Sequence, residues 1–332
     1  MGRVKKLMSL ALVAALCATT ACSSGGSGAG ASSSGASGQA STAQAGSQKS
    51  EGGKKFGYTY WAGSDFFETI GTSMQEVAKQ HGDQVLVVDA QQDQSKQLSI
   101  IEDFISQGVS AVFLNPVDRK GVKPALQKLK DAHIPVINVD TAVADLDMVD
   151  SFIASDNYHA GVICAQDMIK RFPSGGDIAI LDYPANSAIL DRVQGFKDTI
   201  KGKPFNVVAQ QDAQGKPDPG LSKTNDILQA HPNLVAVFGG NDQCAMGAYS
   251  AITESKAKAV VYGVDGAPES KKEIAKGGQF VATGAQSPKK IGVDSIDTAY
   301  KILNNQSYEK KIAVPTFLID KSNVSQYLNG WQ

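Results

Sequence analysis

Short apolar runs alternate with amphipathic stretches along most of the chain. The runs are rich in Val, Ile and Phe, and they cover residues 56–61, 85–89, 111–114, 135–140, 178–181, 205–209, 235–238, 260–264 and 280–283. Several, such as Val85–Val88, are apolar at every position instead of at every second one. A continuous apolar run indicates a strand that is buried on both faces, which is typical of parallel sheets.

Helical spacing fills the intervals between these runs. Phe67, Ile70 and Met74 recur at steps of three and four residues and would line one apolar helix face. Gly82 and Gly108 stand where a helix needs a left-handed residue just after its C-terminal end. The regular alternation of strands and helices predicts a doubly wound α/β fold.

The strand–helix units are too many for one sheet of ordinary size. Four units precede about residue 153, and five follow before residue 286. We therefore expect two Rossmann-like lobes, which agrees with the length of 332 residues. Ligands of open parallel sheets bind beyond the carboxyl ends of the strands, so two facing lobes would place strand-end residues around a shared cleft.

The first residues have the features of a secretory signal. Three basic residues lie within the first six positions, and the apolar run 7–17 that follows is too short to span a bilayer. Small residues then lead to Cys22, a pattern similar to the lipobox of bacterial lipoproteins. We expect a signal peptide over residues 1–21 and a lipid on Cys22 that anchors the protein to a membrane. The alternative is an ordinary cleaved signal followed by an incidental cysteine.

Residues 22–53 are expected to be the lipidated cysteine and a disordered tether. After Cys22 this stretch is nearly all Ser, Gly, Ala and Gln, so it has almost no apolar surface to bury. A tether between a lipid and a folded body suits an extracytoplasmic protein, held at the outer face of the cytoplasmic membrane or in the periplasm.

Composition excludes several kinds of partner. The formal net charge is -1 and no basic stripe stands out, so no nucleic-acid partner is expected. The four histidines are scattered, so we expect neither a metal nor another cofactor. Cys164 and Cys244 lie far apart in apolar helical patterns and are interpreted as small buried side chains.

Polar side chains follow several of the predicted strands. Asp140, Asn241, Asp265 and Gln286 come at or just after strand ends, and a Ser-Asp-Phe-Phe stretch at 64–67 follows the first strand. Carboxylates and amides match the hydroxyl groups of a sugar, and aromatic rings stack on its C–H faces. The alternative for each residue taken alone is an ordinary loop or cap residue.

These stretches resemble one family. From about Lys54 to Lys321 the chain resembles the type I periplasmic binding proteins, in particular their ribose-binding members. The motifs that carry the resemblance, in order, are Asp65–Phe67, Ile134–Asp140, Ile153–Asn157, Arg192–Phe196, Ala236–Phe238 with Asn241 and Asp242, Gly263–Gly266, and Ala285–Gln286. The full set is specific for the family, whereas each motif alone is weak.

The resemblance implies a set of sugar contacts. Phe66 and Phe67 would stack on the sugar ring, and Asp140 would accept hydrogen bonds from its hydroxyl groups. Arg192 would donate to sugar oxygens, although an ion pair with a neighbouring aspartate, 191 or 198, is the alternative. The contacts implied for the second lobe are Asn241, Asp265 and Gln286.

The chain also departs from the ribose-binding pattern. Thr141 replaces an arginine, Ser64 replaces an asparagine, and the place of a third aromatic falls on Gly215 or Lys216. A site that hydrogen-bonds particular hydroxyls discriminates strongly when a partner is missing, so another pentose, a hexose or a polyol is as compatible as ribose. The first strand's 60–61 aromatic pair either replaces the lost ring or packs in the core.

The family's fold passes between its lobes three times. By resemblance we expect passages near 154–156, 285–287 and 314–316. The N-terminal lobe would then comprise 54–154 plus 287–315, and the C-terminal lobe 155–286 plus 316–332. A sugar that touches both lobes only when they are closed would shift the population toward the closed form. Permease subunits of an ABC importer would recognise that form, and we expect the binding protein itself to be a monomer.

Three rival functions remain to be compared with import. An enzyme is not expected, because no carboxylate pair of glycosidase type and no common hydrolase or nucleotide motif occurs. A sugar-responsive transcription regulator would need a helix-turn-helix headpiece where the signal stands. A sugar or autoinducer receptor that presents its ligand to a signalling partner remains an open alternative.

Overall fold

The structure is a computed structural model that describes residues 53–332. The predicted signal peptide, Cys22 and nearly all of the predicted tether lie outside the described residues. The described residues belong to one compact unit, which carries its own hydrophobic cores and therefore has what an independently folding body needs. Within the described part, no helix is both long and apolar enough to cross a bilayer.

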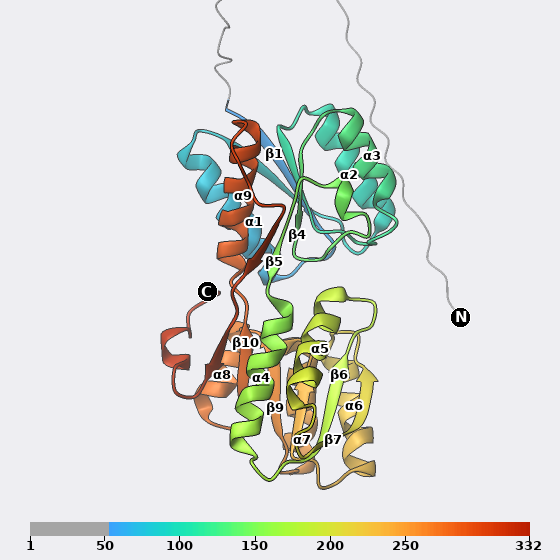
Figure 1. Cartoon of the computed structure of the whole chain (residues 1–332), viewed down its shortest axis with the longest axis vertical. Coiled ribbons are helices and arrows are strands. Elements are labelled where there is room, and N and C mark those ends of the chain that lie inside the picture. Colours follow the sequence, from blue (N-terminus) through green and yellow to red (C-terminus); the bar gives the residue numbers. More distant parts are fainter. Residues whose placement is uncertain (1–52) are drawn as a thin grey trace, which may run out of the picture. The chain divides into compact units, whose positions relative to one another are not determined.

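The first sheet has the strand order β11-β5-β4-β3-β1-β2, and its strands pair in parallel. Helices cover both of its faces (Figure 1). We call this sheet with its helices the first lobe. Its elements are β1 (Lys55–Tyr60), α1 (Asp65–Gln80), β2 (Gln84–Asp89), α2 (Gln94–Ser106), β3 (Ala111–Leu114), α3 (Lys123–Asp131), β4 (Val136–Val139), η1 (Leu146–Met148), β5 (Ser151–Ser155), α9 (Pro288–Leu303) and β11 (Lys311–Val314).

The second sheet has the order β12-β10-β9-β8-β6-β7, with β12 antiparallel to β10 and the other pairs parallel. We call this sheet with its helices the second lobe. Its elements are α4 (Asn157–Arg171), β6 (Gly176–Asp182), α5 (Ser187–Ile200), β7 (Phe205–Asp212), α6 (Pro217–Ala230), β8 (Ala236–Gly239), α7 (Asp242–Ser255), β9 (Val260–Asp265), α8 (Pro268–Lys276), β10 (Phe280–Ala285), β12 (Phe317–Asp320) and η2 (Val324–Gln326).

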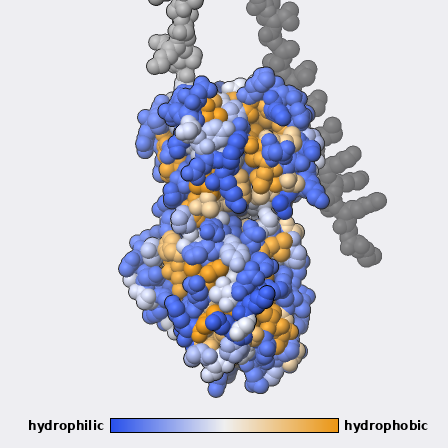
Figure 2. Space-filling view, in the orientation of Figure 1, coloured by the Kyte–Doolittle hydropathy of each residue, from blue (hydrophilic) through white to orange (hydrophobic). Residues whose placement is uncertain are grey.

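Each sheet separates two cores. In β3, Phe113 packs with residues of α1 and α9 on one face, whereas Val112 and Leu114 pack with α2 and α3 on the other. Strands buried on both faces explain why these runs are apolar at every position. On the face drawn in Figure 2, hydrophilic residues predominate and hydrophobic ones form separate patches.

Within residues 53–332 the chain passes between the sheets from β5 to α4, from β10 to α9 and from β11 to β12. The first and third passages lie side by side, because β11 pairs with β5 and the Asp156 amide donates to the Val314 carbonyl at 2.8 Å. The Thr316 hydroxyl also donates to the Asp156 carbonyl at 3.3 Å. Hydrogen bonds therefore couple two of the connections between the lobes.

The predicted doubly wound α/β class is confirmed. Gly82 and Gly108 follow helices in the left-handed conformation that the sequence analysis assigned to them, with φ values of 74° and 65°. The apolar runs of the sequence did not predict the strands β5, β11 and β12. Each has four or five residues, and β11 and β12 lie at sheet edges, so none carries a long apolar run.

Candidate functional site

Strand ends bring polar residues of both lobes together. Asp140 directly follows β4, Asp265 ends β9, and Gln286 follows β10. Asp140 has a φ of 63°, a left-handed conformation that aspartate adopts more readily than most residues, and this turn directs the chain away from the sheet. The parallel sheets thus present these groups at their carboxyl ends, where α/β folds place ligand sites.

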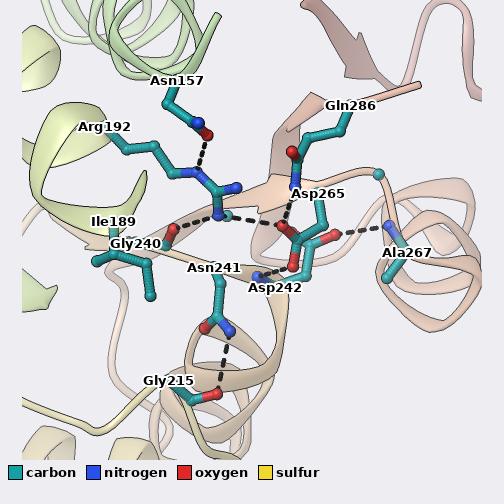
Figure 3. A network of polar contacts seen from close by, with 12 residues as sticks. Asn157, Ile189, Arg192, Gly215, Gly240, Asn241, Asp242, Asp265, Ala267 and Gln286 are labelled. Carbon is teal, nitrogen blue, oxygen red and sulfur yellow. Dashed lines mark hydrogen bonds and ion pairs between the residues drawn. The ribbon is translucent and has the colours of Figure 1, made fainter. Parts of the chain in front are cut away.

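Arg192 of α5 is the centre of the second lobe's half of the site (Figure 3). It is 4% exposed, and its Nε donates to Asn157 Oδ1 at 2.8 Å. Its Nη1 donates to the Gly240 carbonyl at 2.9 Å and to Asp265 Oδ1 at 3.1 Å. Its Nη2 has no hydrogen-bond partner among residues 53–332. The guanidinium is thus fixed by three partners and retains a donor group for a ligand.

Arg192 therefore does not form the helix-face ion pair that the sequence left as an alternative. Its ion-pair partner is Asp265, 73 positions further along the chain. Asp198 instead accepts hydrogen bonds from Tyr158 and Gln194. The long-range pair fixes α5 against the end of β9.

Asp265 accepts three hydrogen bonds from residues of its own lobe. Its Oδ1 accepts from Arg192 and, at 2.8 Å, from Gln286 Nε2, while Oδ2 accepts from the Asp242 amide at 3.3 Å. Burial raises the pKa of the Asp265 carboxyl, and the Arg192 charge acts in the opposite direction. Asp265 is thus placed to orient Arg192 and Gln286, in addition to any ligand contact.

Gln286 has an unsatisfied acceptor. The residue is 2% exposed, and its Oε1 is buried without a partner among the described residues. In Figure 3 the amide nitrogen points to Asp265, and the oxygen carries no dashed line. A buried acceptor without a donor costs free energy, so a ligand hydroxyl that donates here would be favoured.

Asp242 is a neighbour of the site that the sequence analysis did not assign. It is 1% exposed, accepts from the Ala267 amide at 2.8 Å and accepts from the Thr283 hydroxyl at 2.8 Å. Burial, followed by the charge of Asp265, raises the pKa of this carboxyl to about 7. Its bonds shape the turn after β9, which indicates a positioning role. In the sequence it appeared beside Asn241 in one of the motifs that carry the family resemblance, without an assigned role.

Asp140 is the polar centre of the first lobe's half. It is 7% exposed, and its Oδ2 accepts from Thr141 Oγ1 at 3.0 Å and from Asn115 Nδ2 at 3.3 Å. Its Oδ1 has no partner among the described residues. Burial raises the pKa of this carboxyl, while the Arg192 charge opposes the rise. The first lobe's carboxylate therefore lies within electrostatic reach of the second lobe's guanidinium.

Asn115 supports Asp140, and the sequence analysis missed it. It is fully buried after β3, its Nδ2 also donates to the Val139 carbonyl at 3.0 Å, and its Oδ1 accepts from the Trp61 amide at 3.2 Å. This one amide ties the ends of three neighbouring strands to Asp140. A polar residue after β3 was visible in the sequence, but its partners were not.

The predicted aromatic pair lies on the first turn of α1. Phe66 and Phe67 are 9% and 7% exposed and meet edge to face, with ring centroids 5.3 Å apart. Phe67 also stacks on Tyr60 at 5.7 Å and contacts Trp61 edge-on at 6.3 Å. Tyr60 is buried in the first lobe's core, which favours the packing interpretation of this residue over a ligand contact. Phe66 has one further aromatic neighbour, Trp331.

Two other assigned residues also have local structural roles. Asn241 caps α7 by accepting from the Cys244 amide at 3.0 Å, and its Nδ2 donates to the Gly215 carbonyl at 3.0 Å. One amide hydrogen of Asn241 is left for a ligand. Ser64 occupies the N-cap position of α1 without making a side-chain cap bond, so its hydroxyl remains available.

Cys164 and Cys244 are both buried and free of a disulfide. Burial raises the pKa of the Cys164 thiol and raises that of Cys244 to about 12, so both remain neutral thiols. They pack as small apolar side chains, as the sequence analysis interpreted them. Across residues 53–332, no three His, Cys, Asp or Glu side chains are grouped so that they could hold a metal ion.

The arrangement offers hydrogen-bonding groups of both kinds beside aromatic surface. Donors remain on Arg192 and acceptors on Asp140 and Gln286, and each is fixed by neighbours that do not need to move. A molecule with several hydroxyl groups can use all of these at once, because each hydroxyl both donates and accepts. The site is suited to hold such a molecule in one orientation.

Comparisons with known proteins point to one family. A sequence model of the Periplasmic binding protein domain matches residues 58–307. The chain is 35% identical over 251 residues to the ribose import binding protein of Bacillus subtilis, which covers 75% of this chain and 81% of that protein.

Solved structures match as well. An ABC transporter solute-binding protein from Mycobacterium smegmatis with bound glycerol superposes with a TM-score of 0.77 at 31% identity, covering 84% of this chain and 99% of that one. One from Bacillus halodurans with bound myo-inositol gives 0.77 at 26% identity, with the same coverage of 84% and 99%. Because the family model matches most of the chain and the fold agrees with the solved structures, this protein belongs to the type I periplasmic binding proteins.

Proposed function

We propose that this protein is an extracytoplasmic solute-binding protein that captures a neutral monosaccharide or polyol and delivers it to an ABC importer. The observation that carries the proposal is the set of fixed, unsatisfied polar atoms from both lobes: Asp140 Oδ1, Arg192 Nη2 and Gln286 Oε1. The similar proteins support it, since ribose, glycerol and myo-inositol are the compounds they import or hold bound, and all three are neutral polyhydroxyl compounds.

The charges of the site favour a neutral ligand. Two carboxylates, Asp140 and Asp265, flank a single guanidinium, Arg192, and that guanidinium already forms an ion pair with Asp265. A sugar phosphate would bring further negative charge beside Asp140, where the nearest guanidinium, that of Arg192, is already paired. The proposed contacts are Ser64, Phe66, Phe67, Asp140, Thr141, Arg192, Asn241, Asp265 and Gln286.

Binding would act through closure of the lobes. We place the lobe boundaries where the chain passes between the sheets, so that 54–154 plus 287–315 forms one lobe and 155–286 plus 316–332 the other. Charges at the facing surfaces would assist closure. Burial raises the pKa of Asp191 on α5, and the charges of Lys311 and Arg119, both on the first lobe, act against the rise. A ligand that needs both lobes would then favour the closed form.

Attachment and assembly complete the proposal. A lipid on Cys22 would hold the protein at the outer face of the membrane, and residues 23–53 would give the folded body freedom to reach the permease. We propose that the protein acts as a monomer and releases its ligand chemically unchanged, because its task is transfer and not catalysis.

A thermal-shift screen tests this function. Residues 50–332 would be heated with pentoses, hexoses, polyols and their phosphate esters. A neutral ligand at a thousandfold above its Kd should raise the free energy of unfolding by about 4 kcal/mol. Chromatography of the incubated sugar should return it unaltered. The proposal would be wrong if no neutral sugar or polyol stabilised the protein, or if the sugar were turned over.

A further inference from the structure

The last residues of the sequence return to the site. Tyr327 follows η2 and packs on Phe317 of β12, with ring centroids 5.1 Å apart. The next five residues, which we call the 328–332 segment, then lead to the ends of β9 and β10. Figure 1 marks this end of the chain beside the connections between the lobes. No pattern in the sequence predicted the path of this segment.

Hydrogen bonds to residues of the second lobe hold this segment in place. Lys271 of α8 is fully buried, and its Nζ donates to the Gly330 carbonyl at 2.6 Å and to Gln332 Oε1 at 3.0 Å. Gln332 Nε2 in turn donates to the Gln286 carbonyl at 2.5 Å and contacts the Asp265 carbonyl at 3.4 Å. The segment is therefore bonded to the backbone of two residues whose side chains form the site.

The first lobe receives the remaining residue of the segment. The Trp331 indole meets the Phe66 ring edge to face, with centroids 5.4 Å apart and an interplanar angle of 76°. It packs against the first lobe's core while its sequence neighbours are bonded to the second lobe. The segment thus bridges the two lobes next to the aromatic and amide groups of the site.

Two buried polar atoms of these residues lack hydrogen-bond partners. The Trp331 Nε1 donor and the Gln286 Oε1 acceptor are both buried, and neither has a hydrogen-bond partner among residues 53–332. The two residues are linked through Gln332, which follows Trp331 and donates to the Gln286 carbonyl. One is a donor and the other an acceptor, and the hydroxyl groups of a polyol can satisfy both.

We infer that Trp331 is a ligand-binding residue: its ring forms a wall of the site beside Phe66, and its Nε1 donates to a ligand hydroxyl. Lys271 is the positioning residue that anchors the segment. This inference rests on the proposed function and deepens it, because it adds the 328–332 segment to the two lobes as a third part of the site. Closure of the lobes around a sugar then also requires the segment to be in place.

Calorimetric titration of residues 50–332 with a sugar from the screen tests the inference. Trp331→Ala should raise Kd by about tenfold or more, since it loses both a ring and a hydrogen bond. The Kd of Trp331→Phe should lie between those of the unaltered protein and Trp331→Ala, because phenylalanine keeps a ring and loses only the hydrogen-bond donor. Lys271→Met should also raise Kd, and combining it with Trp331→Ala should add little, because both act through the same segment. Val207→Ala is the matched control, since Val207 is 38% exposed on the edge strand β7 and lies outside the proposed site, so the Kd of this variant should not change.

Melting temperatures without sugar separate binding from a structural role. If Trp331→Ala lowers the melting temperature while its Kd equals that of the unaltered protein, Trp331 is a packing residue and the inference is wrong, although the proposed function stands. If the unaltered protein binds no sugar or polyol of the screen, the proposed function is wrong, and this inference, which rests on it, is wrong as well. A higher Kd for Trp331→Ala, with the Kd of Val207→Ala unchanged, supports the inference.

Discussion

Arg192 Nη1 lies 3.1 Å from Asp265 Oδ1, and this pair joins α5 to the end of β9 inside the second lobe. The Arg192 side chain is 5% exposed, so its charge is nearly removed from water and depends on its partners. The pair therefore sets both the orientation of a ligand donor and part of the lobe's stability.

Removing only one partner of this pair should be costly. Arg192→Met leaves Asp265 buried beside Asp242 without its counter-charge, and we expect about 3 kcal/mol or more of lost unfolding free energy. The double variant Arg192→Met with Asp265→Asn should recover much of that loss while sugar binding stays abolished. Urea unfolding and calorimetry measure the two effects. Equal stability of the single and double variants would contradict the role of the pair.

Asp140→Asn tests the first lobe separately. The amide keeps the shape of the carboxylate but loses the charge and one acceptor, so a ligand hydroxyl that donates to Oδ1 should bind about tenfold to a hundredfold more weakly. The melting temperature without sugar should hardly fall, because burial already raises the pKa of this carboxyl and the neutral residue relieves that cost. An unchanged Kd would remove Asp140 from the site.

Asp242 should make the stability depend on pH. Its pKa in the folded protein is about 7, above the ordinary value near 3.8, so the folded state binds the proton more tightly than the unfolded state. Its contribution to stability is therefore complete below about pH 4, is lost progressively as the pH rises toward 7, and changes no further above that.

Asp242→Asn should flatten the dependence of the unfolding free energy on pH, measured by urea unfolding between pH 4 and 8. The absolute stability of this variant will differ from that of the unaltered protein. Asp118→Asn is a suitable control, because that carboxyl is fully exposed and its hydrogen bonds lower its pKa instead of raising it. A profile in Asp242→Asn as steep as that of the unaltered protein would contradict the assignment.

Close packing of α4 against α5 should be essential for the position of the Arg192 side chain. A Cβ on Gly161 would lie 1.9 Å from the Arg192 carbonyl oxygen, and one on Gly195 would lie 2.0 Å from the Tyr158 carbonyl oxygen. Gly161→Ala or Gly195→Ala should force the helices apart, cost about 1–3 kcal/mol in stability and weaken binding, since Asn157 and Arg192 would separate.

Gly202→Ala gives the matched control for these variants. Gly202 has a φ of 74° and no atom of the described chain within 4 Å of an added Cβ. The substitution should therefore cost about 1 kcal/mol through backbone strain alone. Its Kd for sugar should equal that of the unaltered protein, whereas a Kd in Gly195→Ala that also stayed unchanged would contradict the link between helix packing and the site.

The sequence carried most of the fold and the strand-end half of the site. Strands buried on both faces are apolar throughout, so their positions are visible without any tertiary contact. Asp140 and Asp265 could be found because parallel sheets bind ligands at their carboxyl ends. The partners that hold them could not be found this way, because Asn115 and Asn157 are ordinary polar residues until the strands and helices bring them into contact.

Two α/β lobes and a polar edge were predictable from the amino-acid order, because strands buried on both faces of a sheet are apolar at every position. The pairing of Arg192 with Asp265, the bond from buried Lys271 to Gly330 and the contact of Trp331 with Phe66 became visible only in the folded structure. These contacts join residues up to 265 positions apart (from 66 to 331), and no local pattern records them. They form only when folding brings the ends of both sheets and the last residues of the chain together.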